Sequence, residues 1–398
     1  MSPATRSVIV AGARTPIGRF RGAFASLEAV ELGAHSIRAA VERAGIAGEQ
    51  VDYAIVGHVL QAGAGQITSL QASIGAGLPK EVPAITLNKV CLSGMSAIAM
   101  ADQMIRSGEI EVAVAGGMES MTNAPYVVPK ARDGSRLGDA ELVDTMVHDG
   151  LWSSFRNEHM GAGTDEVSSE LGLSREEQDR WAARSHRRAD EAWTSGRMAE
   201  EIVAVEVPQR RGATVSVDRD EGIRPDTTTE RLAALRPAFR PDGTITAGNA
   251  SQISDGACAV IVMSAEKAEE LGVEPIAEIV AYGMSSDRYP SLHTVPALAL
   301  ERALKKAGQG AADLGLVEIN EAFAAVPIHS TRMLGVDEDV VNVNGGAVAL
   351  GHPIGASGAR IVLSLALEMR RRGVDLGGAA ICGGGGQGDA LVLRRLSA

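Results

Sequence analysis

Three side chains capable of covalent and acid–base chemistry stand in glycine-rich segments of this chain. They are Cys91 in NKVCLSGMSA, His352 in GGAVALGHPIGASGAR and Cys382 in AAICGGGGQG. A thiolate is a strong nucleophile, and an imidazole is a base near neutral pH. Each segment follows an apolar run where a strand should end, and such loops converge on one site in folded α/β proteins. We therefore predict a centre made of two thiols and one imidazole.

The residues after Cys91 indicate how its thiol is activated. A helix is expected to open at Leu92-Ser93-Gly94, and a helix N-terminus favours negative charge on a nearby sulfur. A buried structural cysteine is the alternative interpretation. Cys258, inside the apolar run ACAVIVMS, is predicted to be such a core residue.

His352 and Cys382 have distinct surroundings. His352 stands between Gly351 and Pro353, where we expect an exposed imidazole acting as a base, with a plain turn residue as the alternative. Five glycines within six positions follow Cys382, and their bare N–H groups can approach an oxyanion. These glycines formally match G-x-G-x-x-G, but the strand-like ALVLRR follows instead of a helix, so no dinucleotide site is predicted.

Alternating apolar runs and amphipathic segments must position these residues. The apolar runs are SVIVA, YAIVGHV, AITLN and EVAVAGG near the start, and AEIVAYG, LGLVEIN, VVNVNGG and AAICGG near the end. The alternation predicts an α/β protein with a mainly parallel sheet covered by helices.

The two series of segments resemble one another. Similar segments begin at Val51 and Ala312, 261 positions apart, and Cys91 and His352 are separated by the same 261 positions. We therefore predict a duplicated fold in which equivalent strand-to-helix turns supply Cys91 and His352. The general likeness of all α/β units is the alternative explanation.

The pattern changes between about 121 and 250, where Met, Pro, Gly and charged residues are frequent. One helix is predicted there from Ser174, because S-R-E-E is a capping box and an apolar face follows it. We interpret this region as an inserted lid that contributes substrate contacts, with a solvated structural appendage as the alternative.

Composition excludes several classes of protein. The chain has 398 residues, 45% of them hydrophobic, and a formal net charge of −12. This charge argues against nucleic acid or an anionic membrane as the main partner. Three cysteines without a C-x-x-C pair form neither a disulfide framework nor a zinc ribbon. No long apolar run is present, so we expect a soluble, cytoplasmic protein without a metal site.

The three motifs, together with NEAFA at 320–324, resemble the thiolase family. The resemblance runs from VIVAGARTPIG at the start to CGGGGQGDALVL at the end. It implies a duplicated αβαβα layered fold with an inserted loop domain. The implied division is an N-terminal half of 1–120 plus 254–273, a loop domain of 121–253 and a C-terminal half of 274–398.

The chain is most similar to the thiolases that condense two acetyl-CoA molecules to acetoacetyl-CoA and CoA, or run the reverse thiolysis. The resemblance implies that Cys91, activated by His352, carries the acetyl group and that Cys382 removes the α-proton of the second acetyl-CoA. It also implies two oxyanion holes, one from His352 and a water held by Asn320, the other from the N–H groups of Cys91 and Gly384. Coenzyme A is substrate and product, and no other cofactor is implied.

Coenzyme A contacts also carry over from the resemblance. They are Leu151, His159, Met160, Arg224, Ala247, Ser251 and Phe323. Arg231 stands where relatives have a serine near the adenosine, and Leu292 stands where they have a tunnel methionine. Arg210, Arg211, Arg224 and Arg231 would form a local cationic landing site for the phosphates, with a solvated charged face as the alternative for the first two.

Other assignments remain open or are disfavoured. A degradative 3-ketoacyl-CoA thiolase of broader chain length would have the same catalytic residues, and a thiolase-like protein that binds acyl-CoA without turnover is a second alternative. A decarboxylating ketosynthase would have a histidine at 382, and a hydroxymethylglutaryl-CoA synthase would have a glutamate base. Relatives are homodimers or homotetramers, and 121–140 is a candidate subunit contact.

Overall fold

A computed structural model describes residues 5–134, 137–209 and 212–396. Its helices and strands follow the alternation expected from the sequence. The first series is β1 (Ser7–Arg14), α1 (Ala29–Ala44), β3 (Tyr53–Gly57), α2 (Thr68–Ala76), β4 (Ala84–Leu87), α3 (Ser93–Arg106), β5 (Val112–Ser120), β12 (Ser254–Ser264) and α7 (Ala265–Leu271). The second is β13 (Ala277–Ser286), α8 (Val295–Ala307), β14 (Leu316–Ile319), α9 (Ala325–Leu334), α10 (Ala347–Leu350), α11 (Ser357–Arg372), β15 (Leu376–Gly383) and β16 (Gln387–Arg394).

Strand order confirms the duplication. The path is β14-β15-β16-β13-β1-β12-β5-β3-β4, with the short β2 (Gly18–Arg19) paired to β12. β1 and β13 open the two series and pair with each other at the centre, where Ser7 faces Ile279. Outward from this pair, β12, β5 and β3 correspond to β16, β15 and β14. An isolated parallel bridge between Val317 and Val341 stands where the second half would have its equivalent of β4.

The prediction of a mainly parallel sheet was wrong. β3 is parallel to β4 and β5, and β14 is parallel to β15, but the central pairs of both halves are antiparallel. The reason lies in the connections. A tight turn joins β15 to β16 as a hairpin, and the long 121–253 segment returns the chain as β12 beside β5, so neither connection is a helical crossover.

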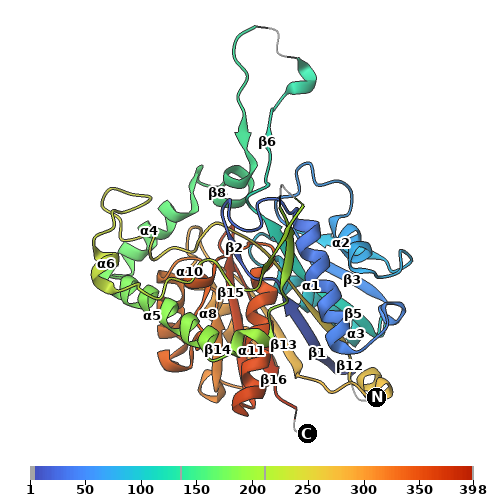
Figure 1. Ribbon diagram of the computed structural model, residues 1–398. Helices are drawn as coiled ribbons and strands as arrows, with labels where there is room; N and C mark the ends of the chain where they lie inside the picture. The colour runs from blue at the N-terminus through green and yellow to red at the C-terminus, as the bar shows by residue number, and fades with distance from the viewer. Residues whose placement is uncertain (1–4, 135–136, 210–211, 397–398) are drawn as a thin grey trace.

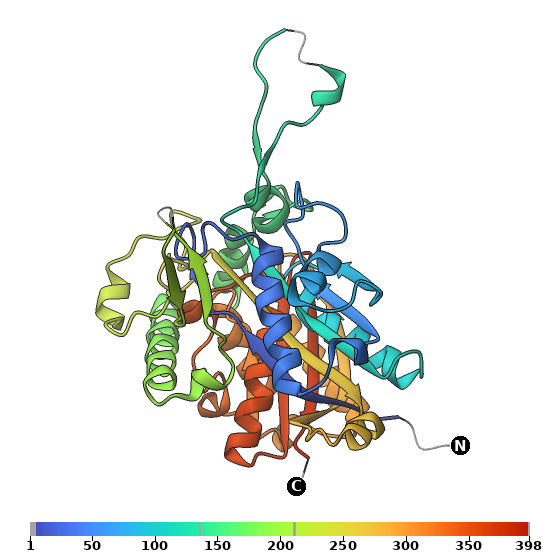
Figure 2. The ribbon, with the colours of Figure 1, turned by 45° about the vertical axis from the view of Figure 1, so that its right-hand side comes forward.

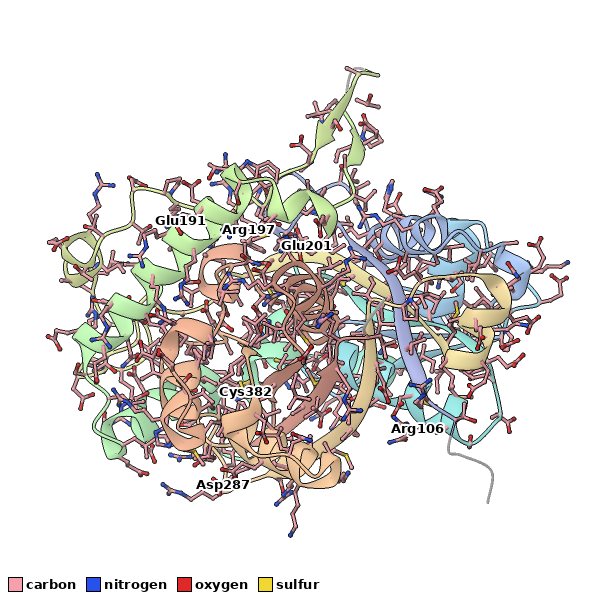
Figure 3. All side chains as sticks on the ribbon, turned by 90° about the horizontal axis from the view of Figure 1, so that it is seen from below. Arg106, Glu191, Arg197, Glu201, Asp287 and Cys382 are labelled. Atoms are coloured by element: carbon pink, nitrogen blue, oxygen red, sulfur yellow. The ribbon has the colours of Figure 1, made fainter. Side chains whose placement is uncertain are left out.

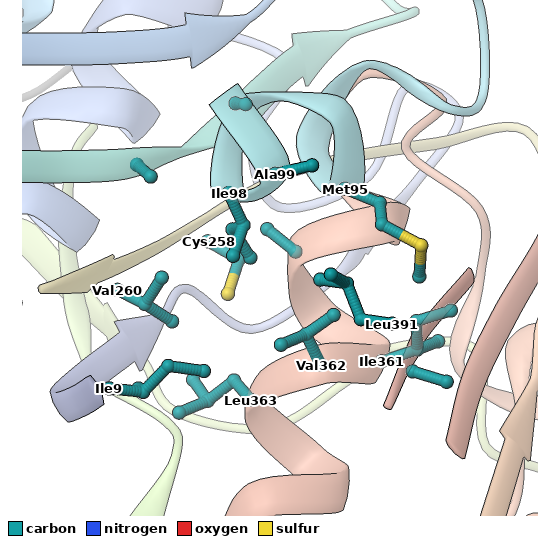
Figure 4. Close-up of a cluster of buried hydrophobic side chains, with 14 of the residues drawn as sticks. Ile9, Met95, Ile98, Ala99, Cys258, Val260, Ile361, Val362, Leu363 and Leu391 are labelled. Carbon is teal, nitrogen blue, oxygen red and sulfur yellow. The ribbon is translucent and has the colours of Figure 1, made fainter. Parts of the chain in front are cut away.

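Two helices form the middle layer of the molecule. α11 is buried from Ser357 to Met369, as expected of a helix covered on all sides, and it packs on α3. Figure 4 shows Met95 and Ile98 of α3 beside Ile361 and Val362 of α11, together with Cys258, which is the core residue that the sequence predicts. The inner faces of both halves of the sheet cover this pair.

The outer layers follow from alternation along the strands. On β5, Ala113 and Ala115 join the middle core, whereas Val112 and Val114 face the cluster formed with α1 and α2. In the second half, α8 and α9 cover the opposite outer face. The layers are therefore αβαβα, as the sequence predicts.

The inserted segment lies on one side of this core (Figure 1). It contains η3 (Met146–Leu151), α4 (Met160–Glu170), α5 (Arg175–Thr194), α6 (Thr229–Ala233) and the paired strands β6 (Tyr126–Val127) with β7 (Val143–Asp144), β8 (Trp152–Ser153) with β9 (Glu158–His159), and β10 (Val205–Pro208) with β11 (Thr214–Val217). The predicted capping box is present at α5, with Glu177 N donating to Ser174 Oγ at 3.2 Å. The chain around β6 and β7 forms an arm that projects far from the body in both ribbon views (Figures 1 and 2). In the described ranges, no helix combines the length and apolar character that crossing a membrane requires.

The 261-residue offset does not hold residue by residue. α3 begins at Ser93 and α11 begins at Ser357, so the equivalent helices start 264 positions apart. Cys91 therefore stands two residues before its helix and His352 five residues before its own. The turns are equivalent, but the loop that carries His352 is longer.

Candidate active site

Cys91 lies in a tight turn between β4 and α3. Val90 has a φ of 51°, which a β-branched residue rarely adopts, so the surrounding contacts must hold the turn in place. The Ser93 hydroxyl supplies two of them, accepting from Lys89 N at 2.8 Å and donating to Val90 O at 2.6 Å. The result is a rigid turn that presents Cys91 just before the helix predicted to follow it.

Burial controls the chemistry of this thiol. It raises the pKa of Cys91 to about 12, and the nearby Glu119 carboxylate adds to the rise. Hydrogen bonds to the sulfur from the N–H groups of Cys91 and Gly384 lower the pKa in part. Cys91 is therefore a neutral thiol at pH 7 and needs a base to become a nucleophile.

His352 is the base that the sequence predicts, but it is not the exposed imidazole that we expected. Its residue is only 6% exposed, because the turn folds inward and Ser254 Oγ accepts its backbone N–H at 3.1 Å. Burial, reinforced by the charge of Arg360, lowers the pKa of His352 to about 3. The imidazole is consequently neutral at pH 7, and the same burial disfavours its protonated form.

Ser357 bonds one ring nitrogen of His352. Its Oγ lies 2.6 Å from His352 Nδ1 and 2.9 Å from Pro353 O. When the hydroxyl donates to Pro353 O it accepts from Nδ1–H, and this arrangement favours the tautomer whose basic atom is Nε2. Within the described residues, Nε2 is buried without a hydrogen-bond partner, as a base awaiting a proton should be.

Cys382 and Gly384 come from the turn that joins β15 to β16. Cys382 pairs with Gly388, and the turn is closed by Gly385 and Gly386 at φ values of 80° and 70°. Such values favour glycine, which explains part of the glycine run. Leu92 and Val90 lie against Gly383 and Gly384, so the turns that carry the two thiols are neighbours despite their separation in sequence. Burial raises the pKa of Cys382, and the nearby Cys91 raises it further. In Figure 3 Cys382 lies inside the molecule.

Asn320 follows β14 and is fully buried. Its Nδ2 lies 3.5 Å from His352 Nδ1, too long for a strong hydrogen bond, and within the described chain its Oδ1 has no partner. The adjacent Glu321 anchors this loop by accepting from Trp181 Nε1 at 2.9 Å and Ser185 Oγ at 2.7 Å, both on α5. A helix of the inserted segment thus holds the NEAFA loop.

Several of the predicted coenzyme A residues gather near the thiols. Phe323 belongs to the same apolar cluster as Cys382, with Met160 and Phe239 packed against it. The His159 ring stacks on Phe239 at 4.6 Å between centroids. Ser251 N donates to Ala322 O at 3.0 Å, which places the Ser251 loop beside the NEAFA loop.

A cavity of about 350 Å³ opens next to these residues. Val90, Gly384 and Met160 line one part of it, so it reaches the Cys91 turn. Trp152, Phe155 and Tyr289 also line it. Its position and mixed lining suit an acyl group with an amide-bearing arm.

The remaining predicted contacts lie farther out. Arg224 and Ala247 are exposed, and Leu151 is partly buried against the middle core. Arg231 forms an ion pair with Asp226, while Arg210 and Arg211 lie outside the described residues. In the part of the chain that the structure describes, no cluster of three or more His, Cys, Asp or Glu side chains could hold a metal ion.

Residues that sequence reasoning missed include Ser357, Val90 and the aromatic wall of Trp152, Phe155 and Tyr289. The Ser357 hydroxyl stands five residues after His352, a spacing that was visible in the sequence but indicated only a repeat. The aromatic wall had no signal, because it joins the 150–155 loop to Tyr289 from the second half of the chain.

A duplicated αβαβα fold that packs the loops of Cys91, His352 and Cys382 against one another has the architecture of a thiolase. The chain belongs to that family. Residues 7–266 match the family model "Thiolase, N-terminal domain", and residues 273–395 match "Thiolase, C-terminal domain".

Individual relatives are similar over their full length. The chain is 54% identical to the "Probable acetyl-CoA acetyltransferase" of Mycolicibacterium smegmatis, with 98% of this chain and 100% of that protein aligned. It is 51% identical to the "Acetyl-CoA acetyltransferase" of Pseudomonas aeruginosa, over 98% of this chain and 99% of that protein. The crystal structure of the Bacillus anthracis acetyl-CoA acetyltransferase matches with a TM-score of 0.97 at 41% identity, covering 100% of both chains.

Proposed function

We propose that this protein condenses two acetyl-CoA molecules to acetoacetyl-CoA and CoA, and catalyses the reverse thiolysis. The packing of the Cys91 turn against Gly383 and Gly384, which follow Cys382, carries the proposal, and the loop after His352 packs on Gly94 of the same turn. The names of relatives that are about half identical over the whole chain support it.

The two thiols take different parts in the proposed cycle. His352 Nε2 accepts the Cys91 proton, and the sulfur attacks the first thioester carbonyl to form an acetyl-Cys91 intermediate. The departing CoA sulfur takes the Cys382 proton, so that Cys382 becomes the thiolate that removes the α-proton of the second acetyl-CoA. The carbanion attacks the acetyl carbon, the bond to Cys91 breaks, and His352 returns its proton to Cys91. Each thiol therefore ends the cycle as it began.

Two oxyanion holes complete the proposed site. The N–H groups of Cys91 and Gly384 would form the first hole, a role supported by their lowering of the pKa of the Cys91 thiol. His352 Nε2 and a water held by Asn320 would stabilise the second oxyanion, a role supported by their unpartnered buried atoms among the described residues. Loss of one such donor costs roughly 3–4 kcal/mol of transition-state stabilisation.

Intact-mass measurement after incubation with acetyl-CoA tests this cycle. We expect one acetyl adduct in the wild type and none in Cys91→Ala. Cys382→Ser should still form the adduct but fail to condense. A wild type without an adduct would indicate a thiolase-like protein that only binds acyl-CoA, and normal condensation by Cys382→Ser would remove Cys382 from the mechanism.

We propose a preference for short acyl groups over the broader range of a degradative 3-ketoacyl-CoA thiolase. Leu292 is buried in the same apolar cluster as Phe323 and Cys382, a position from which it would limit space for a longer chain. The ratio of kcat/KM for acetoacetyl-CoA to that for a longer 3-ketoacyl-CoA measures the preference. Leu292→Ala should shift this ratio toward the longer substrate, and a wild type that already prefers it would reverse the assignment.

We propose that coenzyme A lies along the inserted segment. Its pantetheine arm would contact Leu151, His159, Met160, Ala247, Ser251 and Phe323, and Arg224 would meet its phosphates. Arg224→Ala should then raise KM for acetyl-CoA with little change in kcat. An unchanged KM would exclude this phosphate contact.

We propose that the protein is a homodimer or homotetramer whose subunits meet at the projecting arm. The arm, which projects from the body in Figure 2, carries three exposed apolar residues: Tyr126, Leu137 and Leu142. Exposed apolar surface of this kind favours contact with a protein partner. Light scattering of the wild type and of Tyr126→Ser/Leu142→Ser tests the contact. A monomeric wild type, or an unchanged mass in the variant, would exclude it.

We further propose cytoplasmic action without a metal or a cofactor other than coenzyme A, and without nucleic acid or membrane partners. The net charge of −12 supports the exclusion of polyanionic partners. Activity should survive dialysis against EDTA, and metal-dependent activity would contradict the proposal. The division into 1–120 plus 254–273, 121–253 and 274–398 is likewise a proposal, supported by the pairing of β12 with β5 and β1.

A further inference from the structure

A buried carboxylate joins the two turns that meet at Cys91. Asp389 on β16 is fully buried, and its Oδ1 lies 2.7 Å from Lys89 Nζ. Its other oxygen, Oδ2, accepts the Ser96 hydroxyl at 2.6 Å. Lys89 precedes Cys91 by two residues and Ser96 lies in the first turns of α3, so this carboxylate contacts the nucleophile's turn on both sides.

The register of the hairpin explains why Asp389 reaches this position. Asp389 faces Ile381 on β15, and side chains of directly opposed strand residues share one face of a sheet. Ile381 belongs to the middle core, so Asp389 also points toward α3. Tyr282, from β13, lies near the same carboxylate: burial raises the pKa of its hydroxyl, and the charge of Asp389 raises it further.

The interaction bridges the two halves of the fold. Lys89 and Ser96 belong to the first half, whereas Asp389 follows the turn of Cys382 and Gly384 in the second. Next to it, Val90 packs on Gly384 and Leu92 packs on Gly383, but these apolar contacts have no strong directional preference. A buried carboxylate bonded to an ammonium and a hydroxyl fixes direction as well as distance.

The charges reinforce this coupling. A carboxylate without exposure to water requires a partner, and Lys89 is the cation at bonding distance. Removing either member would leave the other without its counter-charge at the start of the Cys91 turn. The positions of Lys89 and Asp389 are consequently held more tightly than those of an ion pair at the surface.

We propose that Asp389 is a positioning residue that, through Lys89 and Ser96, sets the spacing between the Cys91 and Gly384 amides. One amide comes from each half of the chain, so their spacing depends on how the two halves meet. This inference rests on the proposed oxyanion role of these amides. Asp389 itself touches no reacting atom.

The test compares two reactions of the same sulfur. Acetylation of Cys91 by acetyl-CoA uses the oxyanion hole, whereas alkylation by iodoacetamide depends on the two amides only through the pKa of the thiol. For Asp389→Asn, we expect acetylation to slow by about tenfold or more, since displacing a donor costs part of the 10²–10³ that its removal costs. Alkylation should slow by much less than acetylation, and KM for acetyl-CoA should be unchanged while kcat falls.

Lys89→Met and Ser96→Ala break the two arms of the interaction separately and should each reproduce part of the loss. Asp375→Asn is the matched control, because Asp375 pairs with Arg395 at the exposed start of β15 and should change neither rate. A wild-type rate of acetylation in Asp389→Asn, Lys89→Met and Ser96→Ala would overturn this inference and leave the proposed function standing. An equal loss of acetylation and alkylation would overturn it too, because the carboxylate would then act on the thiol or on folding. A wild type that is never acetylated at Cys91 would instead remove the proposed function.

Discussion

The Ser357 hydroxyl lies 2.6 Å from His352 Nδ1 and 2.9 Å from Pro353 O. A hydroxyl that donates to Pro353 O accepts the Nδ1 proton, which favours a basic Nε2, the atom that the proposed cycle uses on Cys91. A residue at the first position of α11 thus holds the imidazole of His352.

Ser357→Ala should reduce kcat by about tenfold, since an unmade hydrogen bond to a buried ring costs about 1–3 kcal/mol. The measurement is steady-state thiolysis of acetoacetyl-CoA together with a thermal melt. Ser364→Ala is the control on the same helix, because Ser364 bonds Glu201 at 2.7 Å and should affect stability alone. Equal kcat values for the two variants would contradict the role of Ser357.

Gly384→Ala should lower kcat without unfolding the protein. An added β-carbon would lie 3.2 Å from Val90 Cγ2, a tight contact that shifts the Gly384 amide. The loss should be about tenfold, less than that for removing an oxyanion donor. Val90→Ala/Gly384→Ala should recover part of it, and Gly310→Ala, at an open surface position, is the neutral control. Failure of the double variant to recover any rate would show that steric contact is not the cause.

Buried histidines should make the protein acid-sensitive. Burial lowers the pKa of His58 and His186 to about 4 and of His293 and His352 to about 3. The unfolded chain binds protons at these sites below about pH 6.5, whereas the folded protein does not. The contribution of these histidines to the free energy of unfolding is therefore fully present above pH 6.5. It is lost as the pH falls toward 4, by up to about 1.4 kcal/mol per pH unit for each histidine.

His293→Gln isolates one of these contributions, because the amide can keep the contact that His293 Nε2 makes with Ser168 Oγ at 2.9 Å. In urea denaturation between pH 7 and 4.5, the free energy of unfolding of this variant should fall less steeply with pH than that of the wild type. The difference in slope should correspond to about one fewer proton taken up on unfolding. The exposed His148→Gln should leave the slope as in the wild type. A wild-type slope in His293→Gln would refute the assignment.

Arg14→Met should destabilise the fold by about 3–5 kcal/mol, the usual cost of breaking a buried charge pair. The guanidinium lies 2.7 Å from both Glu201 Oε1 and Asp220 Oδ1, and it ties β1 to the inserted segment. Arg19→Met, at an exposed position 3.9 Å from Glu221, should cost under about 1 kcal/mol. Chemical denaturation separates the two, and similar losses would contradict the structural role of Arg14.

Local signals in the sequence were sufficient to predict the helices and strands, but not how the strands pair. The capping box at Ser174 and the helix opening at Ser93 were predicted because both depend on residues a few positions apart. The prediction of a mainly parallel sheet was wrong because the direction of β12 depends on how the long inserted segment returns the chain to the sheet. The prediction that His352 is exposed was wrong because its glycine and proline neighbours predict a turn but not whether that turn faces solvent or the protein interior.

By itself, the sequence predicted which residues would carry the chemistry and determined that the chain is built twice. Cys91, His352 and Cys382 stand out because glycine-rich turns after apolar runs are short-range features, and the repeat is visible as periodicity. Only the tertiary structure decided that the turns of the two thiols are neighbours, that His352 is buried and neutral, and that Asp389 bridges both turns. Burial depends on the whole fold, and the contacts between the turns join residues about 300 positions apart, which folding alone brings together.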